Sequence, residues 1–401
     1  MPQDRRAGPA LHVLKDLALL ACDSVELVDK TANLCVGSGD VAPMGRSHQQ
    51  AWPLQTDVRC IIMPSMKAIV IERHGGPEVL KLKELPSPEP GTGEVCVRVR
   101  AVGINFADLF SRLGLYPDAP KPPFTPGLEA SGEIEALGGD VRGLDRGQRV
   151  MLLARSGGYA EKIGVPATQA IEIPAGMTFE QAAALPVNYL TAYHMLYYMA
   201  NVRKGERVLI HAAAGGVGLA AIELCRTAGA EIFATAGGAK FEFLRARGVE
   251  RLVDYRSQDF EWEIRRMTNG EGVDIVLDAV GGETLAKSYR LLRPAGRLMT
   301  FGFSAAMAGP RINYFKAGLA FLHKPRFDPL RMMRENRAVM GVHLGHLPPK
   351  ILREEYKGLF NFFADGRIRP YVGRTFPLAE AAAAHRYMHE RKNIGKVLLI
   401  P

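Results

Sequence analysis

A short apolar strand that runs into a glycine-rich turn constrains the fold of this chain more than any other feature. Residues 208–218 read VLIHAAAGGVG, and a helix-like segment, Leu219 to Thr227, and a second strand, Glu231 to Thr235, come next. This order of strand, turn, helix and strand is typical of a dinucleotide-binding βαβ unit. The turn departs from the usual G-x-G-x-x-G spacing, so an ordinary tight βα turn is the alternative for this segment taken alone.

Each glycine of this turn has an expected role. Gly215 permits the tight turn, Gly216 lets the backbone approach a pyrophosphate, and Gly218 lets the helix pack close to the strand. The N-terminus of the helix then offers unpaired N–H groups and a positive dipole to the phosphates.

Composition indicates an ordinary globular protein with a basic surface. The chain has 401 residues, of which 47% are hydrophobic and 23% are charged, so two domains are expected. Its formal charge is +9, and residues 311–337 carry 7 Lys/Arg against 2 Asp/Glu. A basic surface suits anionic ligands such as phosphorylated cofactors or anionic lipid, although a solvated face is the simpler explanation. The five cysteines form no C-x-x-C pair, which favours reduced thiols in a cytosolic chain.

The chain divides into four segments by pattern. Residues 1–65 differ in composition from the rest of the chain and are expected to be a poorly ordered extension. From Met66 to residue 188, short β-rich runs alternate with Gly/Pro turns, which predicts a small, partly open β-barrel. Residues 189–345 alternate six strand candidates with helices, which predicts a doubly wound parallel sheet. Residues 346–401 should return to complete the first domain, so the ligand cleft is expected between the two domains.

Several motifs occur in a family's order: MKAIVIERHGGPEVL, VGINFADLFSRLGLYP, PPFTPGLEASGEIEALG, GGYAE, LPVNYLTAYHML, GERVLIHAAAGGVG, DAVGG, GRLMTFG and GKVLLI. Over about five-sixths of its length the chain therefore resembles the zinc-free medium-chain dehydrogenase/reductases of the quinone oxidoreductase (zeta-crystallin-like) group. The stretches AMAGPRINYF and RAVMGVHLGHL are similar to the branch of vesicle amine transport protein homologues, whose members are associated with membranes as well as with reductase chemistry. One departure is Glu223, where the family usually has Gln.

The resemblance implies an α/β fold, with a GroES-like barrel domain and a Rossmann domain. It also implies a cytoplasmic homodimer that acts on a small molecule and has no nucleic-acid partner. Zinc-dependent relatives hold their catalytic metal with an early Cys and a G-H-E motif. Here Asn105 and Leu128 stand at those positions, and Leu cannot coordinate a metal. No bound zinc is therefore expected, and His211 and His343 are interpreted as packed or hydrogen-bonded residues.

The second strand of the βαβ unit indicates the cofactor. NAD-specific sites end this strand with Asp or Glu, which bonds the ribose 2′-OH. Here residues 235–238 read TAGG, with Gly237 where the family often has Ser, and Lys240 comes two residues later. Lys240, and the Tyr255 that matches a family tyrosine, would pair with a 2′-phosphate. The predicted cofactor is therefore NADPH.

The resemblance also implies the remaining site residues. Asn105 and Tyr116 would face nicotinamide and substrate and donate hydrogen bonds to developing negative charge, although a turn residue and a barrel-edge residue are the structural alternatives. The cofactor-binding residues implied are Thr191, Ala214, Gly215, Gly216, Val217, Gly218, Lys240, Tyr255, Phe301, Gly302, Leu344 and Lys396.

Three functions remain in competition. The first is NADPH-dependent reduction of a quinone or an α,β-unsaturated carbonyl compound, and the second is reduction of an enoyl thioester. The third is a lipid-binding or vesicle-associated protein with little turnover. The basic, aromatic insert from Phe303 to Asn336 favours the third, since residues 311–337 could lie on an anionic membrane surface. A packed helix pair that walls the cleft is the alternative for this insert.

Overall fold

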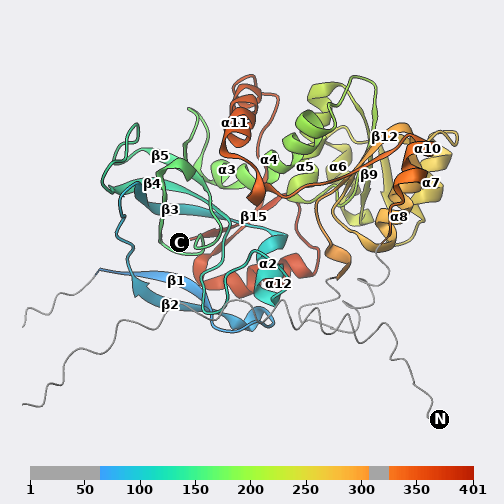
Figure 1. Cartoon of the computed structure of the whole chain (residues 1–401). Helices are drawn as coiled ribbons and strands as arrows, with labels where there is room; N and C mark the ends of the chain where they lie inside the picture. Colours follow the sequence, from blue (N-terminus) through green and yellow to red (C-terminus); the bar gives the residue numbers. More distant parts are fainter. Residues whose placement is uncertain (1–63, 307–324) are drawn as a thin grey trace, which may run out of the picture. The chain divides into compact units, whose positions relative to one another are not determined.

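The computed structural model of the chain describes residues 64–306 and 325–401. Residues 1–63 of the predicted extension and most of the basic insert therefore lie outside the described residues, whereas Ser65, predicted to belong to the extension, is already part of the first strand. The described residues belong to one compact unit, and the predicted combination of a GroES-like domain with a Rossmann-like parallel sheet is confirmed within it. Figure 1 shows both sheets with their helices.

The first domain is built on a mostly antiparallel sheet with the strand order β14-β15-β3-β4-β5-β7, with β6 also paired to β3. A separate antiparallel hairpin, β1–β2, completes this domain. Its early strands are β1 Ser65–Ile71, β2 Leu80–Pro86, β3 Glu94–Ile104, β4 Glu129–Leu137, β5 Arg149–Leu153, β6 Lys162–Pro166 and β7 Ala170–Glu172. Val95, Val97 and Val99 alternate along β3 into a buried apolar core, as a half-buried strand requires.

Two strands of the segment 346–401 belong to this sheet, whereas α11 (Pro349–Ala364), which the sequence also assigned to the first domain, packs into the core beside the parallel sheet. Strand β15 (Lys396–Ile400) pairs antiparallel with β3 and parallel with β14 (Val372–Pro377). The helix between them, α12 (Ala381–His389), packs its Ala381, Ala384 and Met388 into the core of the same domain.

The second domain is a six-stranded parallel sheet with the order β10-β9-β8-β11-β12-β13. Numbered within the domain this is 3-2-1-4-5-6, the Rossmann order, and its switch point lies between β8 and β11. All six strands were predicted: β8 Arg207–Ile210, β9 Glu231–Ala236, β10 Arg251–Asp254, β11 Val273–Asp278, β12 Leu292–Thr300 and β13 Ala338–Gly341.

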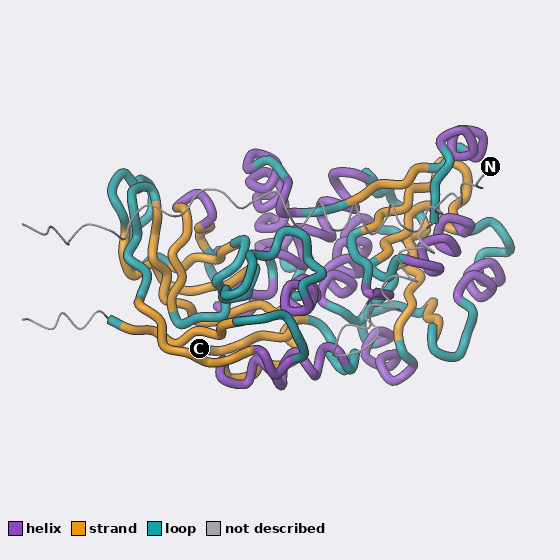
Figure 2. Tube along the Cα trace, turned by 60° about the horizontal axis from the view of Figure 1, so that its bottom comes forward, coloured by secondary structure: helices purple, strands orange, loops and turns teal. Residues whose placement is uncertain are grey.

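Helices cover both faces of the parallel sheet, which is why its strands read as continuous apolar runs. Val208 and Ile210 face one core, and Leu209 between them faces the other. The first core includes α4 Pro186–Tyr193, α5 Gly216–Ala228, α6 Phe241–Arg245 and α11 Pro349–Ala364. The second includes α7 Phe260–Met267, α8 Gly282–Leu291 and α10 Pro329–Glu335. Figure 2 shows these helices around the strands.

The remaining described helices belong to connections. They are α2 Phe106–Leu113, α3 Phe179–Ala184, the π-helical turn η3 His194–Met199, and the short 3₁₀ turns η1 Pro77–Val79, η2 Ala167–Gln169, η4 Gly238–Lys240, η5 Ser304–Ala306, η6 Leu344–His346 and η7 Leu378–Glu380. Among the described residues, no helix has both the length and the apolar character needed to cross a membrane.

Candidate active site

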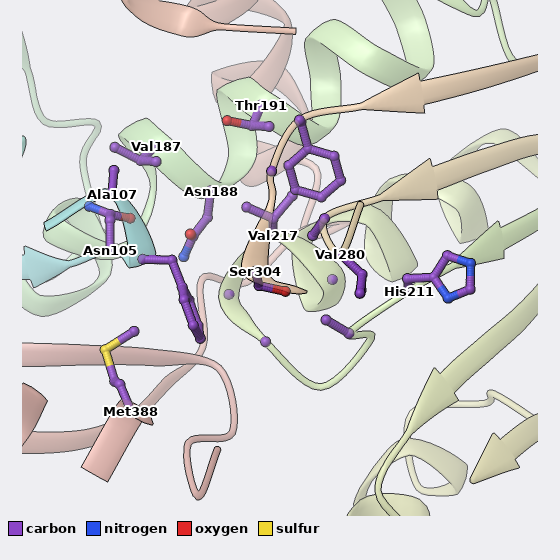
Figure 3. A pocket seen from close by; sticks show the side chains of 18 of the residues that line it. Asn105, Ala107, Val187, Asn188, Thr191, His211, Val217, Val280, Ser304 and Met388 are labelled. Carbon is purple, nitrogen blue, oxygen red and sulfur yellow. The ribbon is translucent and has the colours of Figure 1, made fainter. Parts of the chain in front are cut away.

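A pocket of about 400 Å³ lies beyond the carboxyl ends of the parallel strands and is also lined by the first domain. This is where open α/β sheets bind ligands, next to the switch point between β8 and β11. Figure 3 shows Asn105, Asn188, Thr191 and Val217 around this space. The pocket brings together every predicted site residue: Asn105, Tyr116, Thr191, Ala214, Gly215, Gly216, Val217, Gly218, Lys240, Tyr255, Phe301, Gly302, Leu344 and Lys396.

The glycine turn between β8 and α5 is shaped by close contacts. A Cβ on Gly218 would lie 2.5 Å from the carbonyl oxygen of Ala213, so only glycine lets the helix pack this close to the strand. A Cβ on Gly216 would overlap the amide of Asn188 on α4, a constraint that the sequence pattern did not indicate. The left-handed conformation of the turn falls on Ala212, with φ of 51°, and Gly215 is the N-cap of α5 with φ of −79°.

The loop before β15 is hydrogen-bonded to this glycine turn. The Gly395 N–H donates to the Ala214 carbonyl at 2.8 Å, and Gly395 and Gly215 form a parallel β-bridge. The next residue, Lys396, begins β15. The glycine turn of one domain is therefore hydrogen-bonded to the segment that enters the sheet of the other.

The end of β9 carries a basic group of residues. Strand β9 ends at Ala236, and Gly237 and Gly238 come next, so no carboxylate occupies the position that binds a ribose 2′-OH in NAD-specific sites. Lys240 donates from Nζ to the Asn393 carbonyl at 2.6 Å, and Arg391 donates to the Tyr255 hydroxyl at 3.3 Å.

The residues of this basic group also shift one another's protonation. Burial would raise the pKa of Tyr255, but hydrogen bonds from Arg391 and Arg256 and their charges outweigh it and lower that pKa. Burial lowers the pKa of Lys240, and the charges of Arg256 and Arg391 add to this. Repulsion among three cations makes this corner favourable for an anion.

Sequence reasoning missed Arg391 and Arg256 in this group. Arg391 lines the pocket, and Arg256 borders Gly237, where a Cβ would lie 3.3 Å from its guanidinium. Asp254, at the end of β10, is nearby, but its two carboxylate oxygens accept from the N–H groups of Gly238 and Arg256, each at 3.0 Å.

Asn105 belongs to a buried polar triangle with Glu129 and Lys396. Its amide nitrogen donates to Glu129 Oε1 at 2.8 Å, and its amide oxygen accepts from Lys396 Nζ at 2.7 Å. Lys396 also forms an ion pair with Glu129, and the side chains of this pair are 2% and 0% exposed. The other Glu129 oxygen accepts from the Val187 N–H at 2.8 Å. The triangle therefore holds Asn105 and Lys396 in fixed positions at the wall of the pocket.

Tyr116 lies at another wall of the pocket. Its hydroxyl is 3.0 Å from His343 Nε2, and the two rings stack with centroids 5.9 Å apart. Burial, and then the charges of Asp118 and Asp108, raises the pKa of Tyr116 to about 12. Tyr116 is therefore protonated at neutral pH and can donate a hydrogen bond.

Two expectations about metal ligands can be compared with the structure. His211 is buried and hydrogen-bonded, with its ring nitrogens 2.9 Å from Thr235 Oγ1 and 3.0 Å from Ser288 Oγ, as predicted. At the positions that match zinc ligands in zinc-dependent relatives, Leu128 and the fully partnered Asn105 both line the pocket. Neither side chain offers the nitrogen or sulfur donor that such a site needs.

Part of the predicted membrane segment, residues 325–337, is described. It contains α10, where Leu330 and Met333 are exposed. Two of its arginines, Arg331 and Arg337, pair with Glu335 at 2.7 and 3.2 Å. The aromatic and basic residues before Pro325 lie outside the described residues.

Two protein-family models match the chain. Residues 91–175 match the alcohol dehydrogenase GroES-like domain, and residues 247–399 match the zinc-binding dehydrogenase domain. The second match begins after Asn105 and Leu128, so its description does not bear on those two positions.

Similar proteins cover nearly the whole described region. The synaptic vesicle membrane protein VAT-1 homolog of Rattus norvegicus is 42% identical over 343 residues, which cover 84% of this chain and 85% of the relative. The 2-haloacrylate reductase of a Burkholderia species is 34% identical, with 83% and 98% covered. The crystal structure of Escherichia coli quinone oxidoreductase complexed with NADPH matches with a TM-score of 0.74 at 31% identity and covers 84% of this chain and all of that one.

Proposed function

This chain belongs to the zinc-free quinone oxidoreductase-like family of medium-chain dehydrogenase/reductases, and on that premise we propose that it reduces a quinone or an α,β-unsaturated carbonyl compound with NADPH. The observation that carries the proposal is one pocket that holds a phosphate-binding turn, a basic corner and a protonated tyrosine. The E. coli structure, complexed with NADPH, has the same fold.

The glycine turn fits the pyrophosphate of a dinucleotide. The N-terminal turn of α5, Gly216 to Gly218, lines the pocket, and its N-cap, Gly215, has no side chain to cap it. The first N–H groups of a helix have no partner within the helix, so they are available to an anion. A side chain on Gly216 or Gly218 would fill the close contacts that shape this turn.

The basic corner fits a 2′-phosphate. Lys240, Arg391 and Tyr255 all line the pocket at the end of β9, where a carboxylate would otherwise favour NAD. A phosphate would accept hydrogen bonds from these groups and relieve the repulsion among the cations. This supports NADPH as the cofactor, and when bound it would supply the hydride for the reduction.

The chain's own contribution to the reaction is to bind the acceptor and stabilise charge on its oxygen. Tyr116, whose pKa is raised to about 12, is a hydrogen-bond donor throughout the physiological range. We assign it as the main donor to the acceptor's oxygen. The amide of Asn105 is held by Glu129 and Lys396, so Asn105 positions the wall of the pocket and is the weaker candidate for direct donation.

Hydride transfer in this pocket should not depend on a catalytic zinc, because Leu128 and Asn105 stand where zinc-dependent relatives have metal ligands. Exhaustive chelation should therefore leave turnover unchanged. Loss of activity on chelation, restored by added Zn²⁺, would contradict this part of the proposal.

The acceptor class can be tested directly. NADPH oxidation by the full chain is measured against a quinone, a small enone, a 2-haloacrylate and an enoyl thioester, with Tyr116→Phe as the control for chemistry in the pocket. We expect turnover with the quinone or the enone, and a fall of roughly 10²-fold or more in kcat for Tyr116→Phe. Preference for the thioester would favour the enoyl-thioester alternative, and no turnover with any acceptor would contradict the proposal.

Association with a lipid surface is the second candidate function. It is supported by the exposed Leu330 and Met333 on α10 and by the name of the rat relative. Flotation with anionic liposomes should then exceed flotation with neutral ones and fade at high salt. Flotation equal to that without liposomes would remove this candidate.

A further inference from the structure

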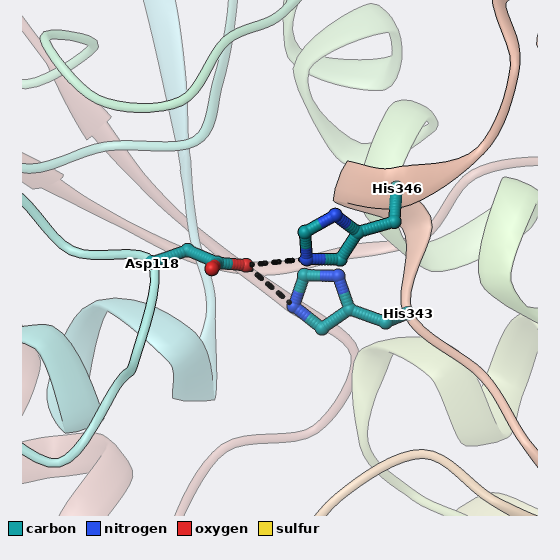
Figure 4. Close-up of side chains that lie close together, drawn as sticks. All are labelled: Asp118, His343 and His346. Carbon is teal, nitrogen blue, oxygen red and sulfur yellow. Dashed lines mark ion pairs between the residues drawn. The ribbon is translucent and has the colours of Figure 1, made fainter. Parts of the chain in front are cut away.

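Two histidines and one aspartate converge at the rim of the pocket, and none of them stands at Asn105 or Leu128, the positions that match zinc ligands in zinc-dependent relatives. Asp118 comes after α2 in the first domain, and His343 and His346 come after β13 in the second. Figure 4 shows the carboxylate of Asp118 directed at both imidazole rings. We propose that Asp118, His343 and His346 bind a divalent transition-metal ion such as Zn²⁺, which ties the two domains together at the rim of the pocket.

The distances among the donor atoms match such an ion. Asp118 Oδ2 lies 3.3 Å from His343 Nε2 and 3.1 Å from His346 Nε2, and the three donor atoms all lie within 4.8 Å of one another. Ligand atoms at about 2.0–2.2 Å from a tetrahedral Zn²⁺ are about 3.3 Å apart. The three side chains can therefore surround an ion with little movement.

The chemistry of the donors selects the class of ion. Two imidazole nitrogens and one carboxylate oxygen suit Zn²⁺, Co²⁺, Ni²⁺ or Cu²⁺, whereas Mg²⁺ and Ca²⁺ prefer sets made only of oxygen. His343 and His346 have side chains that are 40% and 66% exposed, so an ion can reach them from solvent. The remaining coordination positions would be filled by water.

The neighbours of the cluster support its geometry. The rings of His343 and His346 lie 4.7 Å apart by their centroids; His343 is the N-cap of η6 and His346 is its last residue. Tyr116 stacks on His343, with its hydroxyl 3.0 Å from the same Nε2 that would bind the ion. This nitrogen therefore faces two oxygen atoms. An ion coordinated by His343 and Asp118 would use the lone pair of Nε2 that otherwise accepts from the Tyr116 hydroxyl.

The test is a titration of the metal-free full chain with Zn²⁺ alone, measured by calorimetry. We expect one saturable site in the wild type that Asp118→Asn and His346→Ala each weaken by at least about tenfold. The matched control is His74→Ala, an exposed histidine outside the cluster, which should keep the wild-type affinity. Tyr116→Phe removes the hydroxyl that competes for His343 Nε2 and leaves all three donors, so it should bind Zn²⁺ at least as tightly as the wild type.

Two further readouts use the same proteins and do not depend on the proposed reductase activity. Because an ion that binds only the folded state stabilises it, Zn²⁺ should raise the melting temperature of the wild type and not that of Asp118→Asn. Co²⁺ should give visible absorption bands that the same substitution abolishes. Zn²⁺ binding that is absent, or equally strong in Asp118→Asn and His346→Ala, would overturn the proposal and leave a purely hydrogen-bonded cluster.

Discussion

Lys240, Arg391 and Tyr255 form a small basic group at the end of β9, and a single substitution there separates the two nicotinamide cofactors. Lys240→Ala should weaken NADPH binding by roughly 1–3 kcal/mol, because a charge-assisted hydrogen bond to the 2′-phosphate is lost. NADH binding should change little. Isothermal titration with both cofactors measures the difference, with Lys204→Ala, an exposed lysine outside the pocket, as the control. Equal losses for both cofactors would refute the assignment of Lys240.

His389 makes stability depend on pH in the acid range. Burial, and then the charge of Arg112, lowers the pKa of His389 to about 4 in the folded protein, against about 6.5 in an unfolded chain. Between these values the unfolded chain binds more protons, so the free energy of unfolding falls as the pH is lowered from about 6.5 to about 4. Asp108 acts with the opposite sign, since burial raises its pKa to about 7.

The contribution of His389 is therefore measured as the difference in pH dependence of the unfolding free energy between the wild type and His389→Gln. Denaturant unfolding of the wild type should lose more stability over this pH range than unfolding of His389→Gln. His385 also faces His389 and Arg112, and its pKa is lowered well below its ordinary value, so it stays in both proteins as a common background. Parallel pH profiles for the two proteins would contradict the assignment to His389.

Most of the candidate site was predictable from sequence because its residues sit in motifs that the family keeps. Lys240 lies shortly after the predicted strand 231–235 and Tyr255 is the last residue of the predicted strand 251–255, so their place at one edge of the parallel sheet could be expected. Arg391 could not be found this way, because it reaches Tyr255 across 136 positions of the chain. The pairing of Glu129 with Lys396 and that of Asp118 with His343 likewise join residues far apart in sequence, and no local pattern encodes such contacts.

At the scale of secondary structure, the glycine turn before α5 depends on one close contact. Gly218→Ala should lower the free energy of unfolding by about 1–3 kcal/mol, because its Cβ would lie 2.5 Å from the Ala213 carbonyl oxygen. The shift of α5 should also weaken cofactor binding. Gly341→Ala in β13 is the matched control, since nothing lies within 4 Å of the added Cβ. Thermal unfolding of both variants measures the effect. If Gly218→Ala were as stable as Gly341→Ala, this packing constraint would be excluded.

The elements themselves were largely predictable, and the exceptions have physical reasons. Strands β8, β9 and β11 are largely buried apolar runs, and the regular alternation of strand and helix patterns made all six strands of this sheet predictable. The helix predicted from Leu219 begins at Gly216, because the glycines of the turn already form its first residues. Two strands were not predicted. Strand β2 reads LKLKELP and pairs with β1 alone, and β7 has only three residues. Such short or edge strands carry weak patterns.

At the scale of the whole molecule, the described fold starts with β1. Ser65 pairs with Pro86, and the Pro64 carbonyl accepts from the Ser87 N–H at 2.8 Å. A chain that begins at Met63 keeps these contacts, so it should bind NADPH and melt within a few degrees of the full chain. A chain that begins at Met66 loses the pairing of Ser65 with Pro86, so comparing its melting temperature with that of the Met63 chain measures what this pairing contributes to stability. Aggregation of the Met63 chain, or a large fall in its melting temperature, would show that residues 1–62 contribute to the folded core.

The position of β15 has a consequence for how the protein is made. This strand lies between β14 and β3 in the first domain's sheet, yet it is formed by Lys396–Ile400, which come after every strand of the second domain. Domains usually mature in the order in which the ribosome makes them. Here the parallel sheet has all its strands once Gly341 has been translated, whereas the sheet of the earlier domain still lacks β14 and β15. Synthesis would therefore complete the second sheet first, and β3 would remain a partly open edge until β15 has been made.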